Sequence, residues 1–200
     1  MNLAVDVDEV LFPYNRHFLE FYKDRMNGFR LEDLHSFEME KVFGCTRDEI
    51  VKLHDDFALS QTFRTIRPIS LSKHYVNLLS RQHKLFAVSG RPQFLQSVTE
   101  EFIHSNYGER IKEVVCTSSF HKNLNSSTKV EECKKRDIKL ILEDSARYAV
   151  ECAAQGIAVV LFDYSWNQPY NNPGVDHHLI HRVRFWPEAY QAVGLLVENQ

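Results

Sequence analysis

Short runs of hydrophobic residues recur along the chain, and each is followed by a segment with helical character. Near-continuous runs of aliphatic and β-branched residues are typical of strands buried on both faces of a parallel sheet. Five such runs lie at residues 3–7, 84–89, 113–117, 138–142 and 157–162. Their alternation with helical segments predicts an α/β fold with a doubly wound, Rossmann-like parallel sheet.

Two of the intervening helices carry clear boundary signals. After the second run, Pro92 stands at a first-turn position, where its missing N–H costs nothing. The apolar stripe of that helix is Phe94, Val98, Phe102 and Ile103. A second helix is predicted over residues 146–155, because Gly156 supplies a typical stop.

The region from 13 to 70 is too long for a simple crossover between neighbouring strands. Thr46-x-x-Glu49 is a capping box ahead of the apolar Ile50 and Leu53, so at least one helix begins there. The chain has 14 phenylalanines and eight tyrosines. Ten of these aromatic residues, counted together, lie in the segment from Phe12 to Phe63. We therefore expect two or three helices that form a small aromatic-rich cap at 13–70, with 1–12 and 71–200 forming the α/β core.

Length and charge exclude several classes of protein. A chain of 200 residues suits one compact domain with an insert. The formal net charge of -3 provides no polycationic surface, which argues against a protein that binds duplex nucleic acid. Only seven residues are glycine, so a phosphate site cannot depend on a glycine-rich loop.

Cysteine usage and hydropathy bear on the compartment. The four cysteines, Cys45, Cys116, Cys133 and Cys152, form no C-x-x-C pair and are expected to be buried, reduced thiols. Acidic residues interrupt the first apolar run, which a signal peptide does not tolerate. No apolar stretch approaches the roughly 18 residues of a membrane span. We expect a cytoplasmic protein without a membrane partner, and leave a homodimer open.

Acidic pairs follow two of the predicted strands. Asp6 and Asp8 end the first run, and Glu143 and Asp144 end the fourth. Ligands of open α/β sheets bind outside the carboxyl ends of the strands, where these side chains should meet. Buried carboxylates need a cation, and oxygen ligands suit Mg²⁺. The alternatives are that Asp6 or Asp8 caps the next helix and that Asp144 or Ser145 caps the helix that begins near Ala146.

Two further segments offer groups for an anion. Ser89-Gly90-Arg91-Pro92 places a hydroxyl and free amides at an expected helix N-terminus, although Ser89 as a simple N-cap and Arg91 as a surface charge remain alternatives. Lys129 stands in the first turn of a predicted helix, where a cation opposes the helix dipole, and such a misfit indicates function. Lys122 competes with Lys129 for this role.

Taken in order, Asp6-Val7-Asp8, Ser89, Lys129 and Glu143-Asp144 resemble the four motifs of the haloacid dehalogenase (HAD) superfamily of phosphohydrolases, with a cap inserted after the first. The motifs span nearly the whole chain. Residues 141–145, 156–157 and 161–167 also resemble the cytosolic 5'(3')-deoxyribonucleotidase (type C 5'-nucleotidase) branch.

The resemblance implies a role for each matching residue. Asp6 attacks phosphorus and forms an aspartyl-phosphate, while Asp8 protonates the leaving alkoxide and then activates water. Asp6, the backbone carbonyl of Asp8, and Asp144 hold Mg²⁺, with Glu143 acting behind them or through water. The phosphoryl oxygens are held by Ser89, Gly90 and Lys129. The implied reaction is Mg²⁺-dependent hydrolysis of a (deoxy)ribonucleoside monophosphate.

The sequence departs from the family pattern at Glu9, where relatives commonly have glycine. This extra carboxylate either faces away from the site or alters its preference for metal or substrate.

Substrate recognition is expected from the cap. Its aromatic rings could stack on a nucleobase, and Phe12, Phe18 and Phe63, with Arg91, are the candidates; the alternative is that the rings form the core of the cap. Other open alternatives are a phosphatase of a different small phosphate ester and a catalytically silent HAD fold that only binds.

Two C-terminal segments also carry candidate groups. His177, His178 and His181 suggest zinc, but Pro173-Gly174 and Leu179-Ile180 favour a loop that passes into a short strand. Residues 166–169 are expected to form a loop near the site.

Overall fold

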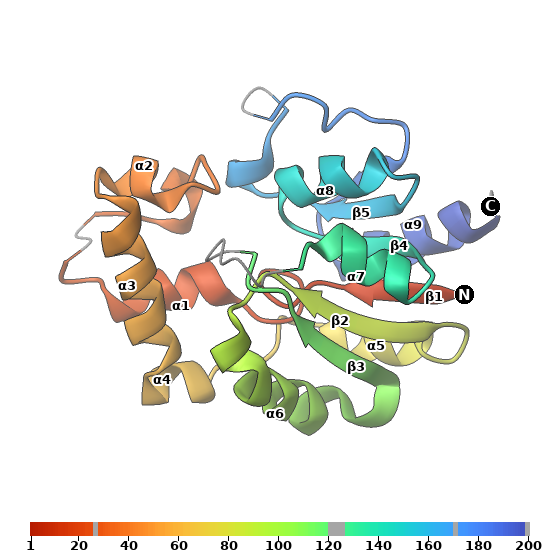
Figure 1. Cartoon of the computed structure of the whole chain (residues 1–200), viewed down its shortest axis with the longest axis horizontal. Coiled ribbons are helices and arrows are strands. Elements are labelled where there is room, and N and C mark those ends of the chain that lie inside the picture. Colours follow the sequence, from red (N-terminus) through yellow and green to blue (C-terminus); the bar gives the residue numbers. More distant parts are fainter. Residues whose placement is uncertain (26–27, 120–126, 170–171, 199–200) are drawn as a thin grey trace.

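The computed structural model describes residues 1–25, 28–119, 127–169 and 172–198. Within these residues, one sheet of six parallel strands has the order β3-β2-β1-β4-β5-β6 (Figure 1). The strands are β1 (Asn2–Val5), β2 (Lys84–Ser89), β3 (Ile111–Cys116), β4 (Ile138–Glu143), β5 (Ala158–Phe162) and β6 (Ile180–Val183). The predicted fold class, a doubly wound parallel α/β sheet, is confirmed.

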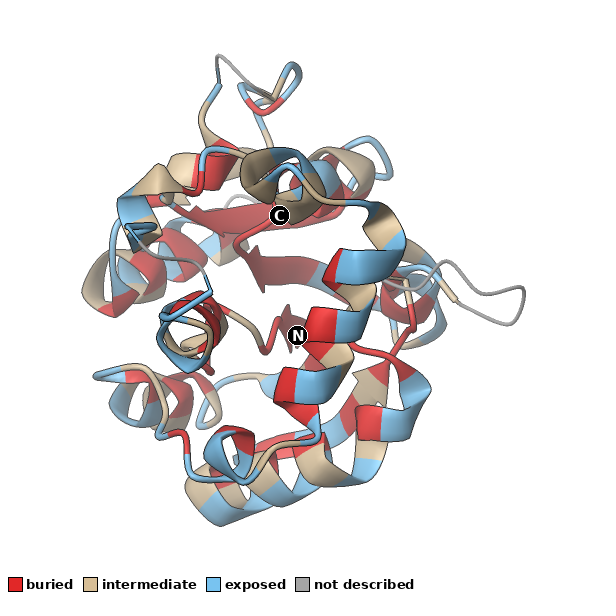
Figure 2. Cartoon of the chain, turned by 90° about the vertical axis from the view of Figure 1, so that its left-hand side faces the viewer, coloured by how far each residue is buried: buried red, intermediate tan, exposed pale blue. Residues whose placement is uncertain are grey.

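The strands are buried on both faces because their side chains alternate between two helical layers. Leu3 and Val5 belong to one apolar cluster, whereas Ala4 belongs to the other. The first cluster lies against α5 (Ser72–Leu79), α6 (Gln96–Tyr107) and α9 (Trp186–Glu198); the second lies against α7 (Lys129–Lys135) and α8 (Ala146–Ala153). Figure 2 shows buried strands at the centre and helices whose inward faces are buried.

The order in which strands are added to the sheet reverses between β1 and β4. The connections through α5 and α6 lead from β1 to β2 and β3 on one side, whereas those through α7 and α8 lead to β4 and β5 on the other. Val5 pairs with Ala87 of β2 and with Leu142 of β4. Open α/β sheets bind ligands at such a switch point, and the first residue beyond β1 here is Asp6.

A helical insert separates β1 from α5 and lies beyond the carboxyl end of β1, on the left in Figure 1. It contains α1 (Tyr14–Phe21), the 3-10 turn η1 (Leu31–Asp33), α2 (Met39–Phe43), α3 (Arg47–Ala58) and α4 (Gln61–Arg64). The described residues of the insert form four α-helices where two or three were expected, because α2 and α4 are too short to show a helical period. The expected capping box is present: Glu49 N donates to Thr46 Oγ1 and Thr46 N donates to Glu49 Oε2.

The helix after β2 begins later than its sequence suggests. Pro92 precedes a 3-10 turn, η2 (Gln93–Leu95), and α6 starts only at Gln96. The turn changes the phase of the helix, so that Phe94 is 52% exposed while Thr99, Ile103 and Tyr107 are buried. The predicted stripe is therefore wrong at Phe94.

Two shorter predictions near the C-terminus hold. Gly156 follows α8 with φ at +75°, a conformation that favours glycine, and the short strand after Leu179 is β6. The remaining turns are η3 (Gly108–Arg110) and η4 (Ser165–Asn167). None of the described helices has both the length and the apolar character needed to cross a membrane.

Candidate active site

Three carboxylates converge at the switch point. Asp6 follows β1, Glu143 ends β4 and Asp144 comes next; one oxygen from each lies within 4.8 Å of the others, and all three residues are buried. Burial, reinforced by the neighbouring Glu143, raises the pKa of Asp6 to about 8. The same two causes raise the pKa of Asp144 well above its ordinary value. Negative charge is therefore in excess at this point.

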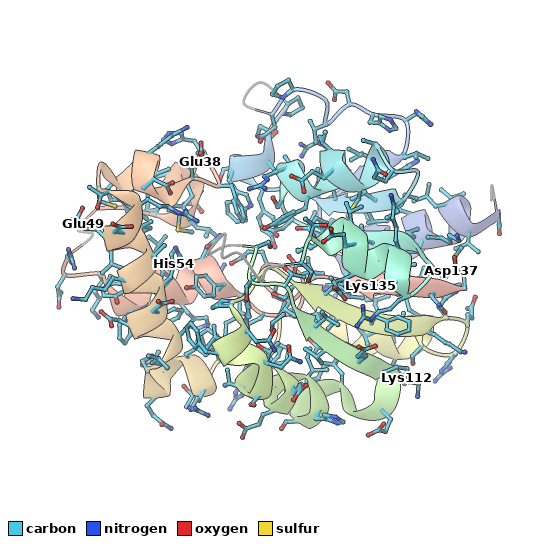
Figure 3. All side chains as sticks on the ribbon, viewed as in Figure 1. Glu38, Glu49, His54, Lys112, Lys135 and Asp137 are labelled. Carbon is cyan, nitrogen blue, oxygen red and sulfur yellow. The ribbon has the colours of Figure 1, made fainter. Side chains whose placement is uncertain are left out.

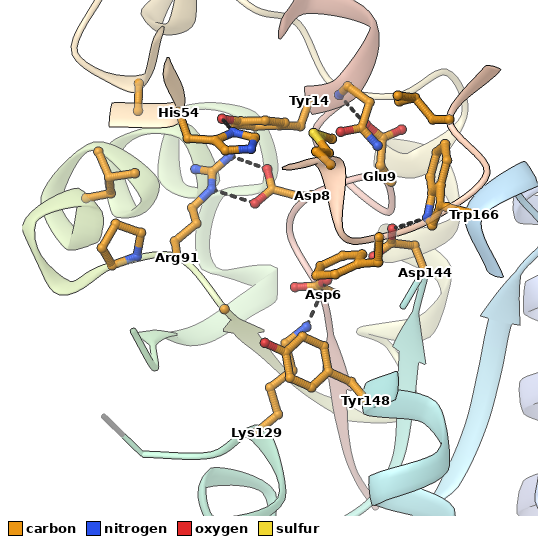
Figure 4. Close-up of a pocket in the computed structure, with 18 of the residues that line it drawn as sticks. Asp6, Asp8, Glu9, Tyr14, His54, Arg91, Lys129, Asp144, Tyr148 and Trp166 are labelled. Carbon is orange, nitrogen blue, oxygen red and sulfur yellow. Dashed lines mark hydrogen bonds and ion pairs between the residues drawn. The ribbon is translucent and has the colours of Figure 1, made fainter. Parts of the chain in front are cut away.

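Lys129 supplies part of the missing positive charge. It is the first residue of α7, behind a capping box formed by Thr128 and Glu131. Its Nζ lies 2.9 Å from Asp6 Oδ2 (Figure 4). The same Nζ lies 2.7 Å from Glu143 Oε2. Burial alone would lower the pKa of Lys129, but the two carboxylates raise it well above its ordinary value. The competing Lys122 lies outside the described residues.

The donor set fits a hard divalent cation. One lysine faces three buried carboxylates, and carboxylate oxygens are the ligands that Mg²⁺ prefers. Glu143 was expected to act behind the metal ligands, and its carboxylate lies in the same cluster. Its Oε1 accepts from the amides of Asp144 (3.3 Å) and Ser145 (3.0 Å), which fixes the side chain.

The acidic side chains do not cap the following helices. The carboxylate of Asp144 accepts from the indole Nε1 of Trp166 at 2.9 Å, and the carboxylate of Asp8 points to Arg91. At the start of α1 it is Glu9 that accepts a bond, from the amide of Asn15. The helix-cap alternative is thus wrong for Asp8 and Asp144.

The buried Arg91 forms an ion pair with the half-buried Asp8. Its Nη2 lies 2.7 Å from Asp8 Oδ1, its Nε lies 3.0 Å from Oδ2, and its Nη1 donates to Thr99 Oγ1. The guanidinium also lies over the rings of Phe12 and Phe63, at 4.5 and 4.9 Å. Burial opposes the charged form, yet Asp8 raises the pKa of Arg91. The alternative of an exposed surface charge is wrong, because Arg91 is only 4% exposed.

The expected anion site at Ser89-Gly90-Arg91-Pro92 is only partly present. No long helix begins there, and the first amide of η2, at Gln93, already donates to Ser118 Oγ at 2.9 Å. The Ser89 hydroxyl is buried and accepts from the amide of Arg91, so it is not the N-cap of α6. Gly90 does line the pocket.

Gly90 has a packing reason to be glycine. A Cβ at this position would lie 3.1 Å from Ser119 Oγ and 3.3 Å from the Tyr148 hydroxyl. These two groups are hydrogen-bonded to each other at 2.7 Å, and the Tyr148 ring lies 4.5 Å from Lys129 Nζ. The residue after β2 must therefore be small to leave this wall of the pocket in place.

Glu9 adopts a left-handed backbone conformation, with φ at +58°. This conformation costs a residue with a Cβ about 1–2 kcal/mol, whereas glycine adopts it without that cost. The side chain lines the pocket and bonds to Asn15 N, while its carbonyl oxygen accepts from the Tyr164 hydroxyl at 2.8 Å. Burial, and Asp8 to a smaller extent, raises the pKa of Glu9 to about 8.

A pocket of about 890 Å³, counting the part open to solvent, lies between the sheet edge and the insert. Its floor includes Asp6, Asp8, Lys129 and Asp144. Most of its wall is apolar or aromatic. The wall includes Leu34, Phe37, Met39, Ala58, Pro92, Leu95, Tyr14, Tyr148 and Trp166.

The three phenylalanines predicted to contact substrate do not line this pocket. Phe12, Phe18 and Phe63 are each at most 2% exposed. The rings of Phe12 and Phe63 pack 4.8 Å apart, and Phe18 stacks on His54. They belong to the hydrophobic core that joins the insert to the sheet, so their prediction as substrate contacts is wrong.

The insert instead presents Tyr14 and His54, which the sequence reasoning missed. The Tyr14 hydroxyl and His54 Nδ1 are hydrogen-bonded, and both residues line the pocket. Figure 3 shows His54 on α3 pointing toward the sheet, whereas Glu49 of the same helix points away. A signal was available, because His54 is four residues beyond the buried Ile50 and so shares its helix face.

The C-terminal histidines form no metal cluster in the described part of the chain. His177 and His178 stack on each other, and His177 Nδ1 accepts from the amide of Leu179. His181 lies in β6. The loop-and-strand alternative is confirmed. All four cysteines are free; Cys116, Cys133 and Cys152 are buried as expected, and Cys45 is half-buried.

Comparisons with known proteins agree with this architecture. No protein-family model matches the chain. It is 26% identical over 199 residues to the Bacillus subtilis (strain 168) protein named "Putative nucleotidase YqfW", covering 96% of this chain and 92% of that protein.

Solved structures resemble the chain over almost its whole length. A protein described as a predicted phosphatase from Clostridium acetobutylicum matches at a TM-score of 0.72 and 11% identity, covering 98% of each chain. A haloacid dehalogenase-like hydrolase from Streptococcus pneumoniae matches at 0.68 and 10% identity, covering 96% of this chain and 97% of that one. The chain therefore has the haloacid dehalogenase-like fold that its four motifs predict.

Proposed function

We propose that this protein is a Mg²⁺-dependent phosphatase that hydrolyses nucleoside monophosphates, as a 5'-nucleotidase does, through an aspartyl-phosphate on Asp6. The observation that carries the proposal is the contact of Asp6 with Lys129, at 2.9 Å, at the floor of a pocket in this fold. A carboxylate nucleophile repels a phosphate dianion, so it needs cations beside it. Lys129 would provide one of them.

The first step would transfer the phosphoryl group to the protein. An Asp6 oxygen forms a bond to phosphorus, the ester P–O bond breaks, and the leaving alkoxide takes a proton from Asp8. In the second step a water oxygen forms a bond to phosphorus, the P–O bond to Asp6 breaks, and Asp8 accepts a proton of that water. Phosphate leaves and both carboxyl groups return to their starting state.

Arg91 affects both steps through Asp8. Its guanidinium contacts both oxygens of Asp8 and fixes the orientation of that carboxyl group. Asp8 therefore faces the reacting oxygen in one orientation, both when it gives a proton in the first step and when it accepts one in the second. The prediction that Arg91 contacts the substrate is therefore replaced by a proposal that Arg91 positions Asp8.

Asp6, Asp144 and the backbone carbonyl of Asp8 would hold Mg²⁺, with Glu143 beside them. When bound, Mg²⁺ offsets the excess negative charge and polarises the phosphoryl oxygens. One solved structure of similar fold, the HAD-hydrolase YfnB from Bacillus subtilis, is described as bound to magnesium; it is 14% identical, with a TM-score of 0.57, and the match covers 96% of this chain and 97% of that one.

A nucleoside is a suitable leaving group for the wall of this pocket. This wall is mostly apolar or aromatic and includes the rings of Tyr14, Tyr148 and Trp166. Among the described lining residues, both basic side chains, Arg91 and Lys129, already pair with acids. A ligand with one phosphate and an uncharged, flat group thus fits better than one with a second anionic group. The name of the similar Bacillus subtilis protein points the same way.

A phosphate-release assay would test the proposal. The panel contains nucleoside monophosphates, sugar phosphates, phosphoglycolate and p-nitrophenyl phosphate, each with Mg²⁺ or with EDTA. We expect Mg²⁺-dependent hydrolysis with a preference for nucleotides, and Asp6→Asn should lose at least about a thousandfold in kcat. Equal activity on sugar phosphates would refute the nucleotidase, and no hydrolysis at all would favour a silent, binding fold.

A further inference from the structure

We propose that Trp166 is a positioning residue for Asp144 and thereby sets the affinity of the cation site. The inference rests on the proposed function, because it assumes that Asp144 holds Mg²⁺. Trp166 donates its indole N–H to Asp144 Oδ2 at 2.9 Å (Figure 4). Both side chains are nearly inaccessible, at 2% and 4% exposed.

The backbone of Asp144 is held by the same segment. Asn167 Nδ2 donates to the carbonyl oxygen of Asp144 and to that of Phe162, each at 2.6 Å. Asn167 Oδ1 accepts from the amide of Tyr164 and from Arg182 Nη1. Trp166 therefore bonds to the side chain of Asp144, and the next residue, Asn167, bonds to its main chain.

This segment is itself fixed to other parts of the site. The Tyr164 ring stacks on Trp166 with centroids 4.4 Å apart and planes 10° apart. The Tyr164 hydroxyl donates to Glu9 O, in the loop that carries Asp6 and Asp8. Ser165 Oγ donates to Leu34 O of the insert at 2.7 Å. The Tyr164 ring thus covers one face of the indole, and the residues that precede Trp166 are tied to the loop after β1 and to the insert.

A fixed donor at one carboxylate oxygen pre-orients a cation ligand. It prevents rotation of the Asp144 carboxylate, so less freedom is lost when the cation binds. Removing such a partner of a metal ligand typically weakens metal binding about 10- to 100-fold. Trp166→Phe keeps an aromatic ring at this position but removes this donor.

Trp186 provides a matched control. It is also 2% exposed, and its indole N–H donates to the carbonyl oxygen of Val10 at 3.1 Å. Trp186→Phe therefore removes the same kind of buried hydrogen bond without touching Asp144. A general loss of stability should appear in both variants, whereas a loss of metal affinity should appear only in Trp166→Phe.

The test is calorimetric titration of Mg²⁺ into the metal-free wild type and both variants, with circular dichroism and Tm recorded for each. We expect the Kd of Trp166→Phe to rise at least about tenfold and that of Trp186→Phe to stay within about twofold. Equal Kd values for wild type and a folded Trp166→Phe would overturn the inference alone. A wild type that takes up no Mg²⁺ would overturn the proposed function and the inference with it.

A second measurement covers the case in which Trp166→Phe does not fold. The chain contains two tryptophans, so Trp186→Phe leaves Trp166 as the sole indole emitter. The emission of Trp166 should change during a Mg²⁺ titration, because the cation binds to the carboxylate that the indole N–H contacts. The Kd obtained from this change should equal the Kd measured by calorimetry. An unchanged emission over a titration that saturates the site would contradict the role of Trp166.

Discussion

The pair of Arg91 and Asp8 shows how a residue role can depend on a partner that is remote in sequence. The two residues are 83 positions apart, and the guanidinium contacts both Asp8 oxygens from within the core. Acidic residues at strand ends could be placed from the sequence, because the carboxyl ends of parallel strands meet. The partner of Arg91 could not, because nothing local in Ser89-Gly90-Arg91 specifies a carboxylate across the pocket.

Arg91→Lys should reduce the transfer of protons by Asp8. Lysine keeps the charge but cannot make the bidentate contact. We expect kcat for a nucleoside monophosphate to fall at least about tenfold. The fall for p-nitrophenyl phosphate should be smaller, since its leaving group needs little protonation. Steady-state kinetics on the two substrates measures the difference.

Arg136→Lys is the control for this substitution. Arg136 also pairs with two carboxylates, those of Glu113 and Glu132, but it does not line the pocket. This variant should keep both kcat values. If Arg91→Lys lowers kcat by the same factor for both substrates, Arg91 does not act through the proton carried by Asp8.

The aromatic residues of the insert show what amino-acid composition cannot predict about single residues. Their enrichment correctly indicates a structured insert, but it does not distinguish rings that face a ligand from rings that form a core. Phe12 and Phe63 are buried because they pack on each other and on the Arg91 guanidinium. That contact needs three segments that only the tertiary fold brings together.

At the scale of elements, α7 carries Lys129 in its first turn, where the helix dipole opposes a cation. The capping box fixes this turn: Glu131 N donates to Thr128 Oγ1 at 3.1 Å, and Thr128 N donates to Glu131 Oε2 at 2.8 Å. Loss of the cap should therefore disturb the lysine as well as the helix.

Thr128→Ala should lower the free energy of unfolding by about 1 kcal/mol, the usual cost of removing such a cap. It should also weaken inhibition by inorganic phosphate, because Lys129 would hold its oxygens less well. We expect the Ki for phosphate to rise at least about threefold. Urea denaturation and inhibition kinetics measure the two effects.

Thr46→Ala is a matched control, since Thr46 and Glu49 form the same capping box at the start of α3. It should cost a similar free energy of unfolding and leave the Ki for phosphate unchanged. An equal change of Ki in both variants would mean that the effect arises from general loosening and not from the position of Lys129.

Elements differ in how well the sequence predicts them. Both α3 and α8 have a start or stop signal and enough length to show a period, and both were found. The helices α2 and α4 have five and four residues, which is too few for a period. The start of α6 was misplaced because Pro92 is equally compatible with the 3-10 turn that precedes it.

At the scale of the whole molecule, the parallel sheet follows from hydrophobic runs that are buried on both faces. The position of the insert against the core does not, because it depends on contacts between distant segments. Glu9 is one of them: it bonds to α1 through Asn15 N and to the segment after β5 through Tyr164. Its titration should therefore affect the stability of the entire fold.

The pKa of Glu9 predicts how stability depends on pH. Burial raises this pKa from 4.5 to about 8, so between these values the folded protein holds a proton that the unfolded chain has released. The stabilisation from Glu9 is complete below pH 4.5 and is lost as pH rises through 8. One such group lowers the free energy of unfolding by at most about 1.4 kcal/mol per pH unit.

Glu9→Gln should therefore flatten this dependence. The amide keeps an oxygen that can accept from Asn15 N but does not titrate. In urea denaturation with EDTA at pH 5 to 8, the free energy of unfolding should fall less steeply for Glu9→Gln than for wild type. A residual slope should remain, because Asp6 also has a pKa raised to about 8.

Glu49→Gln serves as the control. The hydrogen bond from the backbone N–H of Thr46 lowers the pKa of Glu49, so Glu49 is already ionised above pH 5. Its replacement should therefore leave the slope of the wild type unchanged. Parallel curves for wild type and Glu9→Gln would show that Glu9 is ionised throughout this range in the folded protein.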